Sequence, residues 1–186
     1  MKKTEMEKVR KKVLRIIKRA RIALSPRERK SIEICDFGIG DSKNIGIQTL
    51  TYINTDRYSA REIVMLPGQI CPEVRHPPLA PGDPGKQGTF RCRWGEVFLY
   101  TEGKPSRRIR AHIPYQYRDH FSVWKQAVLH PGDQCTIPPD TLHWFQAGPK
   151  GAVVSEFASR SIDERDILTD PHLRRLPNGW ERRPEP

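Results

Sequence analysis

Two histidines stand in turn-and-strand motifs whose spacing could build a metal centre. His76 lies on the run that follows the Pro67-Gly68 turn, and His143 comes after a second turn at residues 131–133. Side chains two residues apart on a strand point to the same face of a sheet. A strand from a distant part of the chain can bring another imidazole to that face. Imidazoles together with a carboxylate are ligands that suit a divalent transition ion.

Two further ionisable residues could do acid–base chemistry. Glu156 is a carboxylate in the apolar run of residues 152–158, where burial would raise its pKa and fit it for proton transfer. A structural ion pair would explain the same position. Lys86 lies two residues before Gly88, so the two positions should share one face and one cavity. The simpler interpretation of Lys86 is a surface lysine at the end of a loop.

Many short strands separated by turns must position these residues. Alternating runs rich in β-forming residues predict strands over residues 46–54, 61–66, 121–129, 134–137 and 152–158. Residues 89–93 and 96–101 flank Trp94-Gly95, which predicts a hairpin there. Turn signals about every ten residues favour a sandwich or a barrel, so the expected fold class is all-β.

The basic charge of the chain lies at its N-terminus. Residues 1–30 hold 13 Lys or Arg and 3 Glu, and residues 31–186 hold 20 basic and 19 acidic residues, so the formal net charge of +11 belongs almost wholly to the first segment. A basic segment could bind nucleic acid or anionic lipid. A solvated helix face explains it more simply, so neither nucleic acid nor membrane is an expected partner.

Helical signals occupy the same basic segment. Apolar residues recur at steps of three and four over residues 6–24, which predicts one helix with an apolar stripe. Thr4 and Glu7 have the spacing of a capping box at its start. Residues 25–28 read Ser-Pro-Arg-Glu, a second helix start. We therefore expect a helical pair that packs on the body through its apolar stripe.

The composition is that of a soluble, cytoplasmic protein of one domain. Hydrophobic residues make up 36% of the chain, and no apolar run approaches the about 20 residues that span a membrane. The four cysteines are scattered without a CxxC pair, which predicts reduced thiols. The expected organisation is a basic helical segment over residues 1–34, a barrel over residues 35–171 and a Pro- and Arg-rich tail over residues 172–186.

The glycine turns, the strand histidine and the later Pro and His follow the two-part motif of cupin barrels. Longer runs resemble those of D-lyxose isomerases, at residues 52–58, 67–69, 71–73, 76–78, 85–87, 89–92, 143–148 and 166–171. The resemblance implies a single cupin (jelly-roll) barrel, usually a homodimer, with a manganese ion. It also implies isomerisation of D-lyxose to D-xylulose and of D-mannose to D-fructose. In that chemistry a metal polarises neighbouring sugar oxygens and a base moves a proton through an enediol.

Two positions depart from the pattern that the resemblance implies. Four metal ligands are expected, and the matching positions are Val74, His76, Gly88 and His143, so only His76 and His143 remain as metal ligands. Loss of a residue that hydrogen-bonds a metal ligand, without touching the metal itself, typically costs roughly 10–100-fold in metal affinity. Loss of two direct ligands should cost more, so we expect doubtful manganese affinity and impaired activity.

The neighbouring Glu73 and Gln87 do not replace the missing ligands, because they fall out of phase with positions 74 and 88. Three explanations stay open: an engineered or inactivated variant, a natural relative with altered function, or an enzyme that uses other ligands. The preserved remainder of the motif favours the first.

The resemblance also points to residues around the expected sugar. Lys86 and Glu156 are the expected catalytic residues, and Lys86 would also contact sugar hydroxyls. Asp166 would bind sugar hydroxyls or only cap a turn. Aromatic residues that would line the sugar pocket, or else belong to the plain core, are Phe90, Trp144 and Phe145. The alternative to an isomerase is a non-catalytic cupin that binds a sugar.

Overall fold

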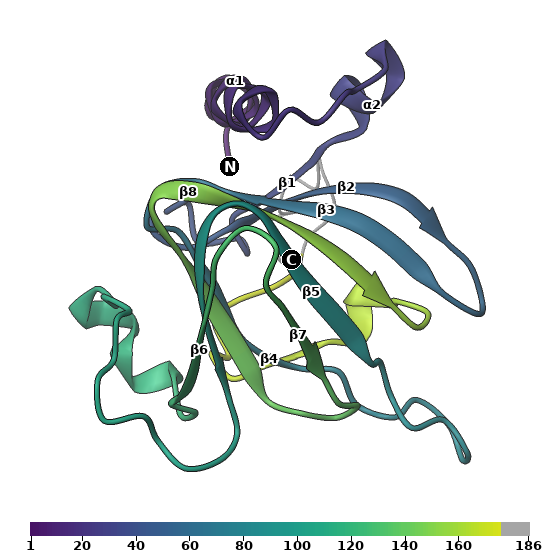
Figure 1. Cartoon of the computed structure of the whole chain (residues 1–186), viewed down its shortest axis with the longest axis vertical. Coiled ribbons are helices and arrows are strands. Elements are labelled where there is room, and N and C mark those ends of the chain that lie inside the picture. The colour runs from purple at the N-terminus through teal and green to yellow at the C-terminus, as the bar shows by residue number, and fades with distance from the viewer. Residues whose placement is uncertain (176–186) are drawn as a thin grey trace, which may run out of the picture.

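The fold is a curled antiparallel sheet with helices on its outside, seen here in a computed structural model that describes residues 1–175 (Figure 1). Its strands are β1 (Glu33–Cys35), β2 (Ile47–Asn54), β3 (Ser59–Met65), β4 (Ile70–Arg75), β5 (Gly88–Thr101), β6 (Lys125–Leu129), β7 (Gln134–Ile137), β8 (His143–Ala158) and β9 (Ile167–Leu168). The helices are α1 (Lys3–Arg19), α2 (Pro26–Ser31), η1 (Tyr115–His120) and η2 (Asp163–Arg165). The strand order is β1-β2-β3-β8-β4-β9, with β5 joining β6, β7 and β8.

Strand β8 is the element that organises the sheet. Its first part pairs with β4 and β5, and its last part pairs with β3 and β5. His143 therefore lies beside Val74 of β4, whereas Glu156 lies between Arg61 of β3 and Phe90 of β5. One long strand thus supplies both an imidazole and a carboxylate to the inside of the curled sheet.

The hairpin expected at Trp94-Gly95 is wrong, because these residues lie within strand β5. The chain runs straight on as one strand from Gly88 to Thr101, with register shifts on both sides of Gly95. Gly95 has φ +76°, and a Cβ there would come 2.0 Å from the carbonyl oxygen of Gly151. The glycine therefore marks a β-bulge with a close backbone approach, and not a turn.

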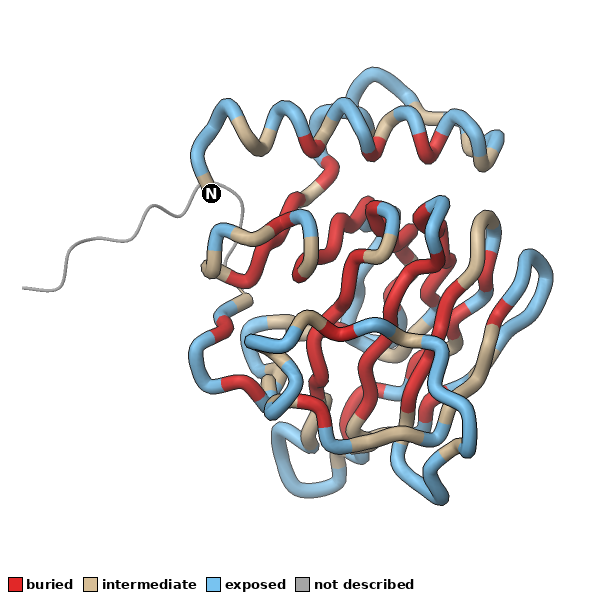
Figure 2. Tube along the Cα trace, turned by 90° about the vertical axis from the view of Figure 1, so that its left-hand side faces the viewer, coloured by how far each residue is buried: buried red, intermediate tan, exposed pale blue. Residues whose placement is uncertain are grey.

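Two apolar clusters hold the fold together. The larger one contains Phe90 and Phe145 together with Trp144. The smaller one lies between the outer face of the sheet and the apolar stripe of α1, formed by Val9, Val13, Ile16 and Ile17. Figure 2 shows this buried stripe of α1 facing the strands, with the rest of the helix exposed. The predicted apolar contact of the first helix is confirmed.

The helix starts agree with the sequence in one case only. Helix α2 has the expected capping box, in which Ser25 and Glu28 each accept a bond from the other's backbone N–H, at 2.7 and 3.2 Å. The predicted box of Thr4 and Glu7 is wrong, because α1 begins earlier and Lys2 occupies the cap without a side-chain bond. Within residues 1–175 no helix has both the length and the apolar character needed to cross a membrane.

The start of the expected tail continues onto the body of the molecule. Leu173 is buried in the larger cluster, and the backbone N–H of Arg174 donates to the carbonyl of Phe37. The rest of the tail, residues 176–186, lies outside the described residues.

Candidate active site

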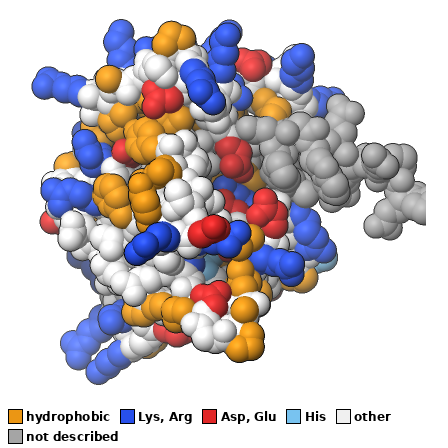
Figure 3. Space-filling model, turned by 90° about the vertical axis from the view of Figure 1, so that its right-hand side faces the viewer, with side chains coloured by type: hydrophobic (Ala, Val, Ile, Leu, Met, Phe, Trp, Pro, Cys, Tyr) orange, Lys and Arg blue, Asp and Glu red, His pale blue; other side chains and the backbone are white. Residues whose placement is uncertain are grey.

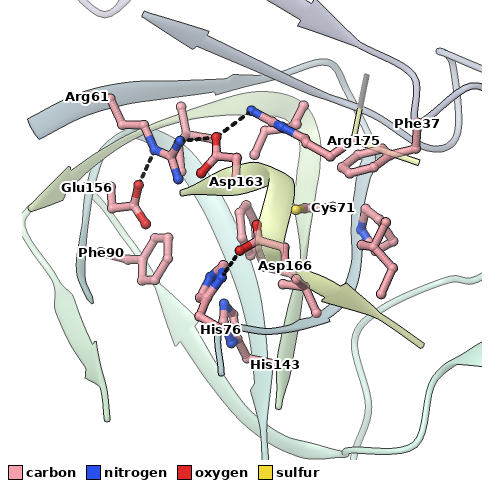
Figure 4. A pocket seen from close by; sticks show the side chains of 16 residues that line it. Phe37, Arg61, Cys71, His76, Phe90, His143, Glu156, Asp163, Asp166 and Arg175 are labelled. Atoms are coloured by element: carbon pink, nitrogen blue, oxygen red, sulfur yellow. Dashed lines mark hydrogen bonds and ion pairs between the residues drawn. The ribbon is translucent and has the colours of Figure 1, made fainter. Parts of the chain in front are cut away.

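One pocket inside the curled sheet gathers most of the expected site residues. The expected residues among those lining it are His76, Phe90, His143, Phe145, Glu156 and Asp166. Figure 4 shows these side chains with the charged groups that surround them. They come from the segment that follows β4, from β5, from β8 and from the segment that follows β8.

The two imidazoles of the pocket are each held through Nδ1. His143 Nδ1 lies 2.8 Å from the carbonyl oxygen of Thr141, so this nitrogen donates and Nε2 carries the lone pair. His76 Nδ1 lies 2.5 Å from Asp166 Oδ1, and the two rings are 5.2 Å apart. Burial, with a smaller contribution from His76, lowers the pKa of His143 to about 3, so His143 is neutral at physiological pH.

The carboxylate of Glu156 lies between two buried cations. Arg61 Nε donates to Oε2, and Lys86 Nζ lies 2.8 Å from Oε1 as an ion pair without directed hydrogen-bond geometry. Burial alone would raise the pKa of Glu156, but Arg61 and Lys86 outweigh it and lower the pKa to about 2. The expectation of a raised pKa is therefore wrong, and Glu156 forms buried ion pairs with Arg61 and Lys86.

A chain of charges links Glu156 to the segment that follows β8. Arg61 Nη1 donates to Asp163 Oδ2 at 2.7 Å, and Arg175 reaches the same oxygen at 3.2 Å. Arg175 also pairs with Glu33 of β1 at 3.2 Å. Arg61 and Arg175 outweigh the effect of burial and lower the pKa of Asp163. The segment that carries Asp163 is thus fixed against β3 and β1 by these ion pairs (Figure 4).

Sequence reasoning missed Arg61, Asp163 and Arg175 as pocket residues. Alternation along β3 places Arg61 on the core-facing side of the strand, and this could have marked it as a pocket residue. A charged side chain in a core-facing position needs partners. No local pattern marks the other two.

Two expected sugar contacts lie elsewhere. Trp144 is outside the pocket: its indole stacks on Tyr100 at 4.0 Å and donates to the carbonyl of Val123 at 2.9 Å. Its neighbours His143 and Phe145 face the pocket, and alternation along the strand turns Trp144 to the other side. Lys86 is buried, is not among the residues lining the pocket, and lines an adjoining cavity that shares His76 and Asp166 with it.

The residues present do not fit a four-ligand metal site. Val74 lines the pocket and lies opposite His143 across the β4–β8 pair, and Gly88 brings no side chain. Glu73 does not substitute, because its carboxylate accepts hydrogen bonds from Ser122, Val123 and Thr169. In the part of the chain that the structure describes, no three His, Cys, Asp or Glu side chains are arranged to hold an ion.

Comparison with solved structures identifies the architecture. L-ribose isomerase from Acinetobacter sp. DL28, in complex with L-ribose, matches with a TM-score of 0.74 over 93% of this chain and 94% of that chain, at 13% identity. L-ribose isomerase from Cellulomonas parahominis, with L-ribose, matches with a TM-score of 0.72 at 14% identity, over 93% and 94% of the two chains. The chain therefore has the cupin-like fold of these isomerases, and the predicted all-β class with an N-terminal helical segment is confirmed.

Sequence comparison is more specific. No family model matches the chain. A D-lyxose/D-mannose isomerase of Thermosediminibacter oceani is 51% identical over 177 residues, which cover 95% of this chain and 97% of that protein. A D-lyxose ketol-isomerase of Thermofilum sp. is 53% identical over 172 residues, 92% of this chain and 95% of that protein. The chain belongs to the D-lyxose ketol-isomerase family, which is a family of aldose–ketose isomerases.

Proposed function

We propose that the pocket receives D-lyxose or D-mannose and converts it slowly to D-xylulose or D-fructose. The observation that supports this most is the Glu156–Lys86 pair, a carboxylate and an ammonium 2.8 Å apart among the residues of the site. The names of the relatives supply the two aldoses, and aldose–ketose isomerisation of these gives D-xylulose and D-fructose. Phe90 and Phe145, with ring centroids 5.6 Å apart, offer apolar faces for the C–H groups of the sugar.

The proposed reaction moves one proton between adjacent carbons of the open-chain sugar. Glu156 takes the proton from C2, the C2–H bond electrons form the C1=C2 bond of an enediol, and the carbonyl oxygen at C1 takes a proton from water. The O2 proton then passes to water as C2 becomes the ketone, and protonated Glu156 gives its proton to C1 as the C1=C2 electrons form the new C1–H bond. The Lys86 ammonium stabilises negative charge on the sugar oxygens during both steps.

The same geometry supports impaired turnover as part of this proposal. A general base works best when its pKa lies near the operating pH. Glu156 has a pKa of about 2 because Arg61 and Lys86 stabilise its ionised form, so it is ionised but weakly basic. Val74 and Gly88 leave the pocket without two of the side chains that the family motif leads us to expect.

The second candidate function is a cupin that binds an aldose without converting it. The full pairing of Glu156 by two cations favours it, because a carboxylate in such a pair can be purely structural. Conversion of the sugar separates the two candidates.

The test is NMR detection of D-xylulose during long incubation of D-lyxose with three proteins. We expect slow conversion by the natural chain and by the control Glu164→Gln, whose glutamate is exposed on η2. Glu156→Gln should be slower by about 10²–10⁴-fold. Saturable D-lyxose binding with no conversion by any protein would favour the binding cupin, and equal conversion by Glu156→Gln would reject Glu156 as the base.

We also propose a homodimer. Four large apolar or aromatic side chains, on strands β2 and β8 and in the turn between β2 and β3, are 37–52% exposed: Tyr52, Ile53, Tyr58 and Phe157. Figure 3 shows hydrophobic side chains gathered on the side of the molecule where these strands end. Exposed apolar patches commonly mark protein interfaces. Light scattering should give a dimer mass for the natural chain and a monomer mass for Phe157→Lys; a natural monomer would reject the proposal.

A cytoplasmic location is the last part of this proposal. Cys71, Cys92 and Cys135 are thiols in the structure, and the first two are buried, which fits a reducing compartment. Titration of the protein as purified, then unfolded without reductant, should find four thiols. Two or fewer would argue for an oxidising compartment.

A further inference from the structure

The pocket retains the supporting groups of a metal centre around its two histidines. Metal-ligating histidines usually donate one ring N–H to an oxygen acceptor, which fixes the ring and frees the other nitrogen. His143 has Thr141 O in this role at 2.8 Å, and His76 has Asp166 Oδ1 at 2.5 Å. Both rings are therefore oriented through Nδ1, and they lie side by side at 5.2 Å.

Position 88 has room for a side chain directed at this pocket. A Cβ on Gly88 would meet its nearest neighbours at ordinary van der Waals distance: Glu156 Oε1 at 3.5 Å, Ala158 Cβ at 3.6 Å and Phe90 Cε2 at 3.7 Å. Two of these three residues, Glu156 and Phe90, line the pocket. A longer side chain at this position would therefore start beside the pocket wall without a backbone clash.

Position 74 faces the same space. Val74 lines the pocket, is 6% exposed, and lies directly across from His143 in the β4–β8 pair. Cross-strand partners have Cβ atoms about 4.5–5.5 Å apart, which is within reach for two imidazoles that share one ion.

The charge at the pocket wall also favours an added carboxylate. Lys86 Nζ is buried, forms its one ion pair within residues 1–175 with Glu156, and makes no directed hydrogen bond in that part of the chain. The oxygen that Lys86 contacts, Glu156 Oε1, is also the nearest atom to a Cβ at position 88. A carboxylate at position 88 would therefore enter beside an ammonium with bonding capacity to spare.

We infer that this pocket is an incomplete metal centre, in which the two histidines and their supports are ready and only the side chains at positions 74 and 88 are missing. As it stands, the chain holds Mn²⁺ weakly, through His76 and His143 alone. The paired substitution Val74→His with Gly88→Glu completes a site of three imidazoles and one carboxylate, a set that suits a divalent transition ion. The inference deepens the proposed function by naming what limits that site.

The test is Mn²⁺ binding, measured by the electron paramagnetic resonance signal of the free ion, which is independent of sugar turnover. The natural chain, each single variant and the double variant are titrated, and circular dichroism checks that each is folded. A residue that only hydrogen-bonds a metal ligand contributes roughly 10–100-fold in metal affinity, and a direct ligand should contribute more. The double variant should therefore bind one ion at least about a hundredfold more tightly than the natural chain. Adding His143→Ala to the double variant should remove most of that gain.

Two results would overturn the inference. Tight 1:1 binding by the natural chain would show that it has a complete ligand set, and a folded double variant without gain would show that positions 74 and 88 do not converge. If the double variant does not fold, Gly88→Glu alone supplies a third ligand and should still gain about tenfold; no gain there would also reject the inference. Failure of the natural chain to convert D-lyxose would reject the proposed function and leave these binding results unaffected.

Discussion

Replacing Arg61 with methionine tests the charge network that builds the pocket. Arg61 is 8% exposed and binds both Glu156 and Asp163. Methionine has a similar length but no charge, so both carboxylates would lose this partner while most of the packing stays. Removing one partner of a buried ion pair typically costs about 3–5 kcal/mol, because the remaining charge stays buried without compensation.

The pKa of Glu156 gives a second route to this magnitude. Its fall from an ordinary value of 4.5 to about 2 corresponds to about 3 kcal/mol of extra stability for the ionised form at neutral pH. Burial opposes this fall, and Arg61 is the largest of the groups that cause it. We therefore expect Arg61→Met to lower the free energy of unfolding by about 3–5 kcal/mol at pH 7.

The assay is urea and thermal unfolding followed by circular dichroism. A chain of this size should lose about 6–20 °C in Tm. The matched control is Arg107→Met, because Arg107 is exposed in the loop between β5 and η1; it should change the free energy of unfolding by less than about 0.5 kcal/mol.

The pH dependence has a definite sign. In the natural chain the pKa of Glu156 is depressed, so its stabilising contribution is present above about pH 4.5 and is lost as the pH falls toward 2. In Arg61→Met, burial should raise the pKa of Glu156, so the gap between the two proteins should narrow as the pH falls through 4.5. Equal stability at pH 7, or a gap that stays constant down to pH 3, would refute the reasoning.

Three further predictions follow from single positions. Gly95→Ala should lower the free energy of unfolding by at least about 2 kcal/mol, because φ is +76° and a Cβ would meet the carbonyl of Gly151. Chemical unfolding measures this change, and a loss under about 0.5 kcal/mol would contradict the bulge. Val13→Ala should lower the free energy of unfolding by about 2 kcal/mol, since Val13 is fully buried between α1 and the sheet. An unchanged urea midpoint would mean that α1 does not pack on the sheet. Cys71 should resist alkylation at pH 8 until the protein unfolds, because burial raises the pKa of its thiol to about 12. Mass spectrometry measures the labelling at this residue, and fast labelling of the native protein would contradict the prediction.

The strands and the histidines could be predicted because their signals are local. Alternation and turn residues located β2, β3 and β7 closely, and the motif of glycine turns followed by histidines indicated that His76 and His143 share one cavity, which both of them line. Gly95 shows the limit of such signals, since a glycine with positive φ serves a turn or a bulge equally well. Only the pairing of β5 with β8 across the whole strand decides for the bulge.

The electrostatics of the site could not be predicted from local patterns. Glu156 gains its low pKa from Arg61, a residue 95 positions away along the chain. Asp163 and Arg175 join the network only because the segment after β8 folds back over the pocket. The position of Trp144 outside the pocket could have been predicted from the sequence. It stands between His143 and Phe145 on one strand, so alternation turns its side chain to the opposite face.

Solvent deuterium exchange tests the central claim most directly, that the pocket moves a proton at C2 of an aldose through Glu156. D-lyxose is incubated with the protein in D₂O, and proton NMR follows the C2 hydrogen of the sugar. Deuterium should enter C1 of the D-xylulose formed, and C2 of the recovered D-lyxose, to the extent that the proton on Glu156 exchanges with D₂O before it is returned, and both exchange and conversion should be lost in Glu156→Gln. Exchange and conversion that are unchanged in Glu156→Gln, or D-lyxose that binds without exchange or conversion, would contradict the claim.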